Sequence, residues 1–482
     1  MKRPMFCGAI IASICVFISY YNIRTTLLCG VGLICFIVAF AVNKVKAKNY
    51  FAIGVAFLVL ISLVFTYKHL EKIDKYSGER IVETFVVTDV EEGEKYNSIT
   101  ALCKSGTVLP KNIKLRISCF DKTEKFIMGN CVTASVNIKS LKNSDNKAYY
   151  YSSGIYATGK LGNVLERHSD NIFYKRAGKI KNYVKSTISR NMQKDNAATL
   201  LGITIGDKNL FTDEFNNNVK LTGVSHVMVV SGMHLTIILG AVFWLLDKIF
   251  YHAYIRLLIS FSAIVMITSI CGFTLSVVRA GVMFLFLSLA PVVNRDNDSL
   301  NSLGTAIIAI LLYCPFAVLN VGFQLSALAT FGIIYFVPFF DKRLKIQNKL
   351  LKGLVLSFIV TLSATVMTTP VCIYHFGYIS LISPITNLLI SFAVTVALCL
   401  GIIGLFLNLV PLIYVLTDII FKCAEITTMY INFVINYLAK FPFAAVRAGD
   451  LLLIASIFIS IGSVLFIYTC KKRDNLLKLN YK

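Results

Sequence analysis

The stretch SPITNLLISFAVTVALCLGIIGLFLN, residues 383–408, contains no charged side chain. A run of about 20 apolar residues is long enough to cross a bilayer as a helix. Comparable runs recur along the 482-residue chain, which is 56% hydrophobic, only 15% charged and has a mean hydropathy of +0.71. A soluble protein of this length carries roughly a quarter charged residues. The composition therefore predicts a polytopic α-helical membrane protein.

The apolar segments predict roughly 11–12 membrane spans. They lie near 5–21, 27–42, 50–67, 226–246, 256–272, 277–293, 302–318, 323–340, 353–373, 383–408, 411–439 and 451–469. With alternating sides, the loops and termini on one side carry 18 Lys or Arg, whereas the short loops on the other side carry Arg24, Lys440 and Arg447. Cytoplasmic loops of membrane proteins are enriched in Lys and Arg. The count places both termini in the cytoplasm, and it explains much of the net charge of +23 without nucleic acid.

The cysteines and the N-terminus indicate which metal sites, signal peptides and disulfides the chain can contain. None of the 13 cysteines forms a CxxC or another metal-ligand spacing, so we expect no metal and no cofactor. The first apolar segment lies too close to the second, and lacks a small-residue cleavage site, to be a removable signal peptide. Everything after Tyr67 up to the next span is predicted to lie outside the cell, where a disulfide among Cys103, Cys119 and Cys131 could persist. Which pair forms, if any, stays open.

The polar region from about Lys68 to Asn196 contains alternating runs that predict β-strands. The five runs are residues 80–90, 97–104, 112–119, 130–141 and 154–165. Five strands in about 90 residues are typical of a small barrel, and the OB-fold is a candidate architecture.

A basic stretch, residues 171–192, follows the last strand with apolar residues at helical spacing. Residues 151–196 contain nine Lys or Arg against three Asp or Glu, whereas residues 68–150 are nearly neutral. Two interpretations remain open for this stretch. It is either a helix that lies on anionic lipid headgroups or a basic surface that gathers phosphates.

Few ionisable groups interrupt the apolar runs, where each costs several kcal/mol unless it meets a partner or a water-filled cavity. At about 100° per residue, Ser231 and His234 are predicted to share one helix flank with His226. A Ser–His hydrolase is an alternative, but no orienting carboxylate has a recognisable placement. Arg279 either reaches the membrane surface or lines a polar path. Lys422 and Glu425, three residues apart, are predicted to form a local ion pair.

Several blocks resemble one known family. GITIGDKNLFTDEFNNNVKLTGVSHVMVVSGMHL (202–235) resembles the opening signature of the ComEC competence domain, a Gly-Asp-basic stretch leading through Thr-Gly and Ser-His to Ser-Gly-x-His. The similarity continues in LSVVRAGVMFLFL (275–287), PFAVLNVGFQLSALATFGI (315–333) and TTPVCIYHFGYISLISPITNLL (368–389). Upstream, NKAYYYSSGIYATGKL (146–161) is similar to the end of the family's OB-like domain. The blocks occur in order and cover nearly the whole chain.

The resemblance implies a non-enzymatic membrane channel that carries single-stranded DNA into the cell during natural transformation. It implies transmembrane helices in 1–67, an extracytoplasmic OB-like domain in 68–170, a basic connecting segment in 171–225, a multi-helix competence domain in 226–470 and a cytoplasmic tail in 471–482. His226, Ser231, His234 and Arg279 are expected to line the channel. Gly223, Gly232, Gln324, Pro370 and Asn387 are expected to shape the backbone. The candidates for DNA contact are Tyr149, Tyr150, Tyr151, Tyr156, Lys175 and Arg176.

Many family members also carry a metallo-β-lactamase-like domain that is proposed to degrade one DNA strand. The chain ends twelve residues after Cys470 and has no H-x-H-x-D-H cluster, so we expect no metal-dependent nuclease in it. Besides single-stranded DNA and the lipid bilayer, the expected partners are a separate nuclease and a DNA receptor. A cytoplasmic ATPase or helicase is expected too, because the chain has no P-loop; homo-oligomerisation stays open. The alternative function is a transporter or lipid-handling protein that keeps this fold with another substrate.

Overall fold

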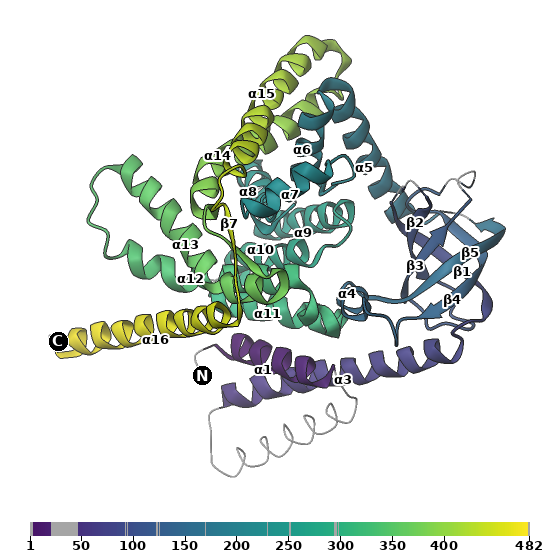
Figure 1. Ribbon diagram of the computed structural model, residues 1–482, viewed down its shortest axis with the longest axis horizontal. Coiled ribbons are helices and arrows are strands. Elements are labelled where there is room, and N and C mark those ends of the chain that lie inside the picture. Colours follow the sequence, from purple (N-terminus) through teal and green to yellow (C-terminus); the bar gives the residue numbers. More distant parts are fainter. Residues whose placement is uncertain are drawn as a thin grey trace. The chain divides into compact units, whose positions relative to one another are not determined.

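The chain is described by a computed structural model, which covers residues 3–20, 47–91, 93, 95–121, 124, 126–168, 170–228, 230–249, 252–293, 296 and 298–480. The predicted span 27–42 lies outside these residues. The chain divides into two compact units, one formed by residues 1–183 and 238–323 and the other by residues 184–237 and 324–482. Most of the described chain is helical, and the strands of the first unit form one small barrel (Figure 1).

Seven described helices are long and apolar enough to span a membrane. They are Gly54–Lys75 within α3 (Ala47–Lys75), α8 (Gly232–Ile249), α9 (Ala253–Ile270), α12 (Val321–Asp341), α13 (Lys349–Phe376), α14 (Ser383–Leu407) and Asp450–Arg473 within α16 (Asp450–Asn480). Shorter apolar helices are α1 (Pro4–Ser19), residues 275–290 of α10 (Leu275–Val293) and α11 (Ser299–Tyr313). The predicted helical architecture with several candidate spans is therefore confirmed for the described residues, but these contain seven candidates where the sequence predicted roughly 11–12 spans.

In the first unit, α1 packs against both α3 and α11. Gly304 of α11 permits this contact, because a Cβ atom at that position would lie 2.4 Å from the backbone nitrogen of Phe6. Asp298 caps the N-terminus of α11 by accepting from the backbone N–H groups of Leu300 and Asn301, and it also pairs with Arg3 at 2.7 Å. Carboxylates are favoured at this end of a helix because the backbone N–H groups there lack helical partners. Together these contacts fix the N-terminal helix on the bundle.

The five predicted strands are confirmed and close into a barrel. They are β1 (Arg80–Glu91), β2 (Asn97–Cys103), β3 (Lys114–Cys119), β4 (Cys131–Ser140) and β5 (Ile155–His168), in the order β1-β2-β3-β5-β4, and β4 pairs with β1. Only β3 and β5 run parallel, so the strand order differs from the chain order, as in Greek-key barrels such as the OB-fold. Burial alternates along β3, as expected for a strand with one face in the core. Cys103, Cys119 and Cys131 are buried and free.

Phe316, in the short 3-10 helix η1 (Pro315–Leu319), connects the barrel region to the bundle. Its ring is fully buried, stacks on Tyr151 of α4 (Lys147–Ser152) at 5.3 Å and meets the edge of Tyr67 of α3 at 5.6 Å. Aromatic pairs at these centroid distances are attractive beyond their burial. The same η1 therefore contacts α3, which leads into the barrel, and α4, which precedes its last strand.

In the second unit α14 forms one helical hairpin with the preceding helix α13 and another with the following helix α15 (Tyr414–Leu438). α13 ends at Gly377, β6 (Tyr378–Ser380) follows, and α14 runs away from it to Leu407. α15 packs along α14 and leads to β7 (Ala445–Arg447), which pairs with β6 before α16 begins. Because the β6–β7 pair joins the start of α14 to the end of α15, the two 25-residue helices have equal extent and opposite direction. α15 is outside the set of candidate spans, although it is as long as α14 and packs along it.

Three boundaries differ from the sequence prediction. α3 continues to Lys75 instead of ending near Tyr67, and α8 begins at Gly232 instead of residue 226. The helix α13 passes through Pro370 and ends only at Gly377, whose left-handed φ of +72° caps it. Glycine adopts this conformation without the steric cost of a Cβ atom, which explains why the helix ends there.

Candidate functional site

The described residues of the signature segment 222–231, which are 222–228, 230 and 231, form an irregular stretch that leads into α8. Val224, Val227 and Met228 are buried, and His226 is exposed. Because α8 begins after this segment, the predicted helix flank shared by His226, Ser231 and His234 is wrong. Burial of small apolar side chains, rather than helical phase, holds the segment in place.

Ser231 and His234 meet instead through a capping interaction. His234 is fully buried, and its Nδ1 accepts a hydrogen bond of 3.0 Å from the backbone N–H of Ser231. This is one half of a capping box, in which the third helical residue binds back to the residue before the helix. Since Nδ1 of the neutral ring accepts from the backbone, it carries no proton and Nε2 does. The bond to the backbone competes with Ser231 Oγ, 3.3 Å away, so the geometry does not favour a Ser–His hydrolase.

Replacing His234 by alanine is expected to destabilise the protein by about 2 kcal/mol, because a capping bond and buried volume are lost together. His234→Gln should recover part of this loss, since glutamine can bind back in a capping box. Ser231→Ala keeps the backbone donor and should cost less than about 1 kcal/mol. Thermal unfolding of the purified protein in detergent measures all three. Equal losses for Ser231→Ala and His234→Ala would contradict the capping role.

Two of the resembling sequence blocks converge at Gly223. The residue has a φ of +71°, and a Cβ atom there would lie 2.7 Å from Cβ of Ser383 and 2.9 Å from Cβ of Ser380. The hydroxyl of Ser380 donates to the carbonyl of Leu221 at 2.8 Å. Asn387 donates to the hydroxyl of Ser383 at 3.2 Å, and its own carbonyl oxygen is buried without a hydrogen-bond partner among the described atoms. The signature segment is therefore held on the β6–α14 connection at van der Waals distance.

The remaining predicted residues lie on separate elements. The amide oxygen Oε1 of Gln324 lies 3.2 Å from Nε2 of His375, and this hydrogen bond joins α12 to α13. Gly232 is the first residue of α8, and Pro370 lies inside α13. Arg279 belongs to the first unit, is 5% exposed and donates to the sulfur of Met283 one turn further along α10. Its burial contradicts a side chain extended to the membrane surface.

The predicted Lys422–Glu425 ion pair is wrong. Lys422 pairs with Asp418 at 2.8 Å, one turn earlier in α15. Glu425 instead accepts from the backbone N–H of Gln193 at 2.8 Å, at the N-terminus of α6 (Lys194–Ile205). A carboxylate is stabilised there by the unpaired amides at the start of the helix. The sequence spacing could not reveal this partner, because Gln193 lies more than 200 residues away.

The predicted DNA-contacting tyrosines differ in exposure. Tyr149 is 60% exposed, and Tyr150 packs edge-on against it at 5.4 Å. Tyr156 is partly buried. Tyr151 is 3% exposed and stacked on Phe316, so its ring is unavailable to a base in this structure. Tyr151 is therefore placed where it cannot contact DNA, and the prediction for this residue is wrong.

The predicted basic helix is confirmed as α5 (Ile172–Asn191), which has six basic and no acidic residues. Half of its cations are paired within the described residues: Lys175 with Asp170 at 2.7 Å, Lys181 with Asp89 at 2.8 Å and Lys185 with Asp207 at 3.3 Å. The hydrogen bond from Lys175 lowers the pKa of Asp170. The other three basic side chains of α5, those of Arg176, Lys179 and Arg190, are exposed. At 100° per residue they lie within about 60° of one another, so they form a basic stripe.

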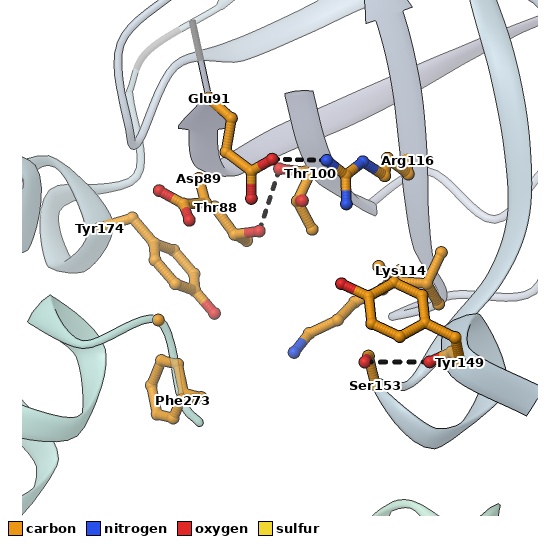
Figure 2. A pocket seen from close by; sticks show the side chains of 12 residues that line it. Thr88, Asp89, Glu91, Thr100, Lys114, Arg116, Tyr149, Ser153, Tyr174 and Phe273 are labelled. Atoms are coloured by element: carbon orange, nitrogen blue, oxygen red, sulfur yellow. Dashed lines mark hydrogen bonds and ion pairs between the residues drawn. The ribbon is translucent and has the colours of Figure 1, made fainter. Parts of the chain in front are cut away.

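A cavity of about 180 Å³, which we call the junction pocket, lies in the first unit where the barrel meets the turn between α9 and α10 (Figure 2). Sequence reasoning missed it, because its walls come from four separate parts of the chain. They are Thr88, Asp89, Glu91, Thr100, Lys114, Arg116 and Ile155 of the barrel, Tyr149 and Ser153 around α4, Tyr174 of α5, and Gly272 and Phe273 of the turn.

The local fold explains how the charged residues reach the pocket. Lys114 and Arg116 are two apart on β3, so they share its outer face while Leu115 is buried. A bulge in β1 between Val87 and Asp89 inserts one extra residue, which redirects the strand end toward the pocket. The signal that could have revealed the pair is the alternation KLRISC at residues 114–119.

Three of the four charged side chains that line the junction pocket form ion pairs, and the fourth, Lys114, does not do so among the residues that the structure describes. Glu91 pairs with Arg116 at 2.5 Å and Asp89 pairs with Lys181 at 2.8 Å. Within the described residues the Lys114 ammonium has neither a hydrogen bond nor an ion pair, and burial lowers its pKa. In Figure 2 this ammonium and the Tyr174 hydroxyl point into the cavity. The pocket thus offers one uncompensated cation among aromatic rings. No group of three His, Cys, Asp or Glu side chains in the described part of the chain could hold a metal ion.

Comparison with known proteins gives one family and two curated relatives. Residues 203–473 match the family described as "Competence protein". The chain is 25% identical over 252 residues to "ComE operon protein 3" of Bacillus subtilis (strain 168), covering 52% of this chain and 31% of that protein. It is 21% identical over 314 residues to "Recombination protein 2" of Haemophilus influenzae, covering 61% and 38%. The chain therefore spans about a third of the length of the curated relatives it matches. No solved structure matches it significantly.

Proposed function

The chain belongs to the competence protein (ComEC) family, and on this premise we propose that it is the channel component that carries single-stranded DNA across the bacterial cytoplasmic membrane. The family match covers residues 203–473, which include the converging segments at Gly223 and the helices α12 to α16. That match is the observation that carries the proposal. Family membership supports a role in DNA uptake, and the channel role is our extension of it.

Contacts inside the first unit support an extracytoplasmic barrel. The topology from charged loops puts three connections on the outer side: the one after α3, the turn 271–274 and residues 319–322. The first leads into β1, the second lies against Asp89 of the barrel, and Asn320 of the third donates to Ser152 beside α4 at 3.5 Å. Since the three connections all reach the barrel region, the barrel and these connections share one side. The excess of Lys and Arg on the opposite loops supports the proposal that this side is outside.

We propose that His226 and Ser231 line the translocation path, and that the buried His234 and Arg279 hold its wall in shape. His234 and Arg279 are buried polar groups in apolar helices, where such groups are rare unless they face a partner or a polar cavity. His226 is exposed beside the capping interaction, which suits a position at the outer mouth. Gly223, Gly232, Gln324, Pro370 and Asn387 would shape the walls rather than touch the strand.

The basic stripe and the exposed tyrosines would receive DNA before it reaches the bundle. Basic residues follow phosphates and aromatic rings stack on bases, without sequence preference. Arg176 and Tyr149 fit these roles best, whereas the ammonium of Lys175 is engaged by Asp170. Tyr150 and Tyr156 retain partial exposure. The stripe also suits anionic headgroups, and the two ligands share phosphate chemistry.

In this scheme the protein guides DNA and performs no chemistry. A cytoplasmic ATPase or helicase would supply energy, and a separate nuclease and DNA receptor would act before translocation. Both termini would lie in the cytoplasm, and the domain limits expected from the sequence (68–170, 171–225 and 226–470) would separate reception, connection and passage.

A deletion strain tests the proposal. We expect nuclease-protected uptake of labelled DNA to fall to the background of cells given no DNA, and a plasmid copy to restore it. Total surface-bound DNA, measured before nuclease treatment, should stay unchanged because the receptor is a different protein. Normal protected uptake in the deletion strain would contradict the channel role and favour a transporter of another substrate.

A further inference from the structure

We propose that the junction pocket takes one unpaired base of a DNA strand, with Phe273 stacking on the base and Lys114 contacting the adjacent phosphate. The proposal rests on the proposed function and adds to it a selection point for single strands. Its first support is size. The cavity of about 180 Å³ is comparable in size with a single base and smaller than a base pair.

The second support is the backbone at Phe273. Gly272 already supplies the left-handed residue that ends α9, with a φ of +70°, and Phe273 is left-handed as well at +54°. A bulky residue in this region costs on the order of 1–3 kcal/mol and is retained where the surroundings impose it, often at functional sites. Here the conformation presents an aromatic ring to the cavity (Figure 2). Base stacking on aromatic side chains is tolerant of sequence because every base has a π face.

The third support is the distribution of charge. The carboxylates of Asp89 and Glu91 are each bound to a cation, and they would repel a phosphate placed near them. Lys114 is the one cation lining the described pocket without a carboxylate partner. A phosphate is therefore directed to Lys114. Figure 2 shows Tyr174 and Phe273 on the side of the cavity opposite Lys114.

Binding of a labelled ten-nucleotide oligothymidylate to the full-length protein in detergent, followed by fluorescence anisotropy, tests the pocket. Phe273→Leu keeps the bulk and the backbone conformation but removes the π face, and it should weaken binding by roughly tenfold, within the range of one stacked base. Lys114→Met should weaken binding several-fold and flatten the slope of log Kd against log salt by about 0.7, as expected for one lost phosphate contact. Phe273→Leu should leave that slope unchanged. A ten-base-pair duplex should bind equally to wild type and to both variants.

Matched controls come from the same barrel. Phe120 is 57% exposed and Lys142 is exposed, and neither lines the pocket. Phe120→Leu and Lys142→Met should change binding less than twofold, and unchanged elution and melting of each variant exclude misfolding. Pocket variants that bind the oligonucleotide like wild type, or controls that lose as much as the pocket variants, would overturn the proposal. If the wild-type gene restores uptake while pocket variants bind normally, only the pocket proposal fails. If the variants show the expected binding losses but the wild-type gene does not restore DNA uptake, only the channel role is refuted.

Discussion

Replacing Gly223 by alanine is expected to destabilise the protein by on the order of 3 kcal/mol and to abolish DNA uptake. Two costs act together. The φ of +71° strains any residue with a Cβ atom, and that atom would lie 2.7 Å from Cβ of Ser383. Because the signature segment is held on the β6–α14 connection by this contact, the segment must move away when the contact is blocked. Thermal unfolding in detergent and protected DNA uptake measure the two effects.

Gly377→Ala separates strain from steric overlap. Gly377 has nearly the same φ, +72°, but nothing lies within 4 Å of the place where its Cβ atom would be. This variant should lose only the strain, about 1 kcal/mol. If Gly223→Ala and Gly377→Ala lose equal stability, close packing at Gly223 is unimportant and the proposed convergence of the two blocks is wrong.

The other large effect is expected at Gly304, where alanine should destabilise the protein by about 3 kcal/mol. A Cβ atom would lie 2.4 Å from the nitrogen and 2.5 Å from the Cα atom of Phe6, both rigid backbone atoms, so α1 has to leave α11. Gly54 in α3 provides the opposite case, since nothing lies within 4 Å of its Cβ position. Gly54→Ala should be neutral or stabilise by up to about 1 kcal/mol through helix propensity. Glycine to alanine is thus expected to lower stability at Gly304 and to preserve or raise it at Gly54. Equal losses of stability at both positions would contradict the close packing of α1 on α11.

Sequence patterns predicted the elements whose residues repeat with a clear period. The five strands and the basic helix α5 are confirmed, and seven predicted spans recur as candidate spans, because alternation and continuous apolar runs are local properties. Burial of individual side chains was less predictable. Tyr151 and Tyr149 stand two residues apart in one polar run, yet one is covered by Phe316 and the other is exposed. The difference in their exposure comes from the contact of Tyr151 with Phe316 of η1, more than 150 residues along the chain.

Interactions between distant segments account for the remaining differences. The spacing of Lys422 and Glu425 is compatible with a local pair, but the amide of Gln193 offers Glu425 a better partner. His226 does not follow the helical phase of α8, because the chain around it is irregular and is held by buried valines. The junction pocket needs a strand, a helix and a turn to meet, which no single stretch of sequence encodes. Such sites become visible only when the walls are assembled.

The two-stranded β6–β7 sheet has a consequence for membrane insertion during synthesis. α15 contains Asp418, Lys422 and Glu425 and is less apolar than its neighbour α14, so its own partitioning into lipid is weak. Its register beside α14 becomes fixed when residues 445–447 emerge and pair with 378–380. About 65 residues of nascent chain separate the two strands. We therefore expect α15 to take its final place beside α14 only after the residues of β7 have been synthesised.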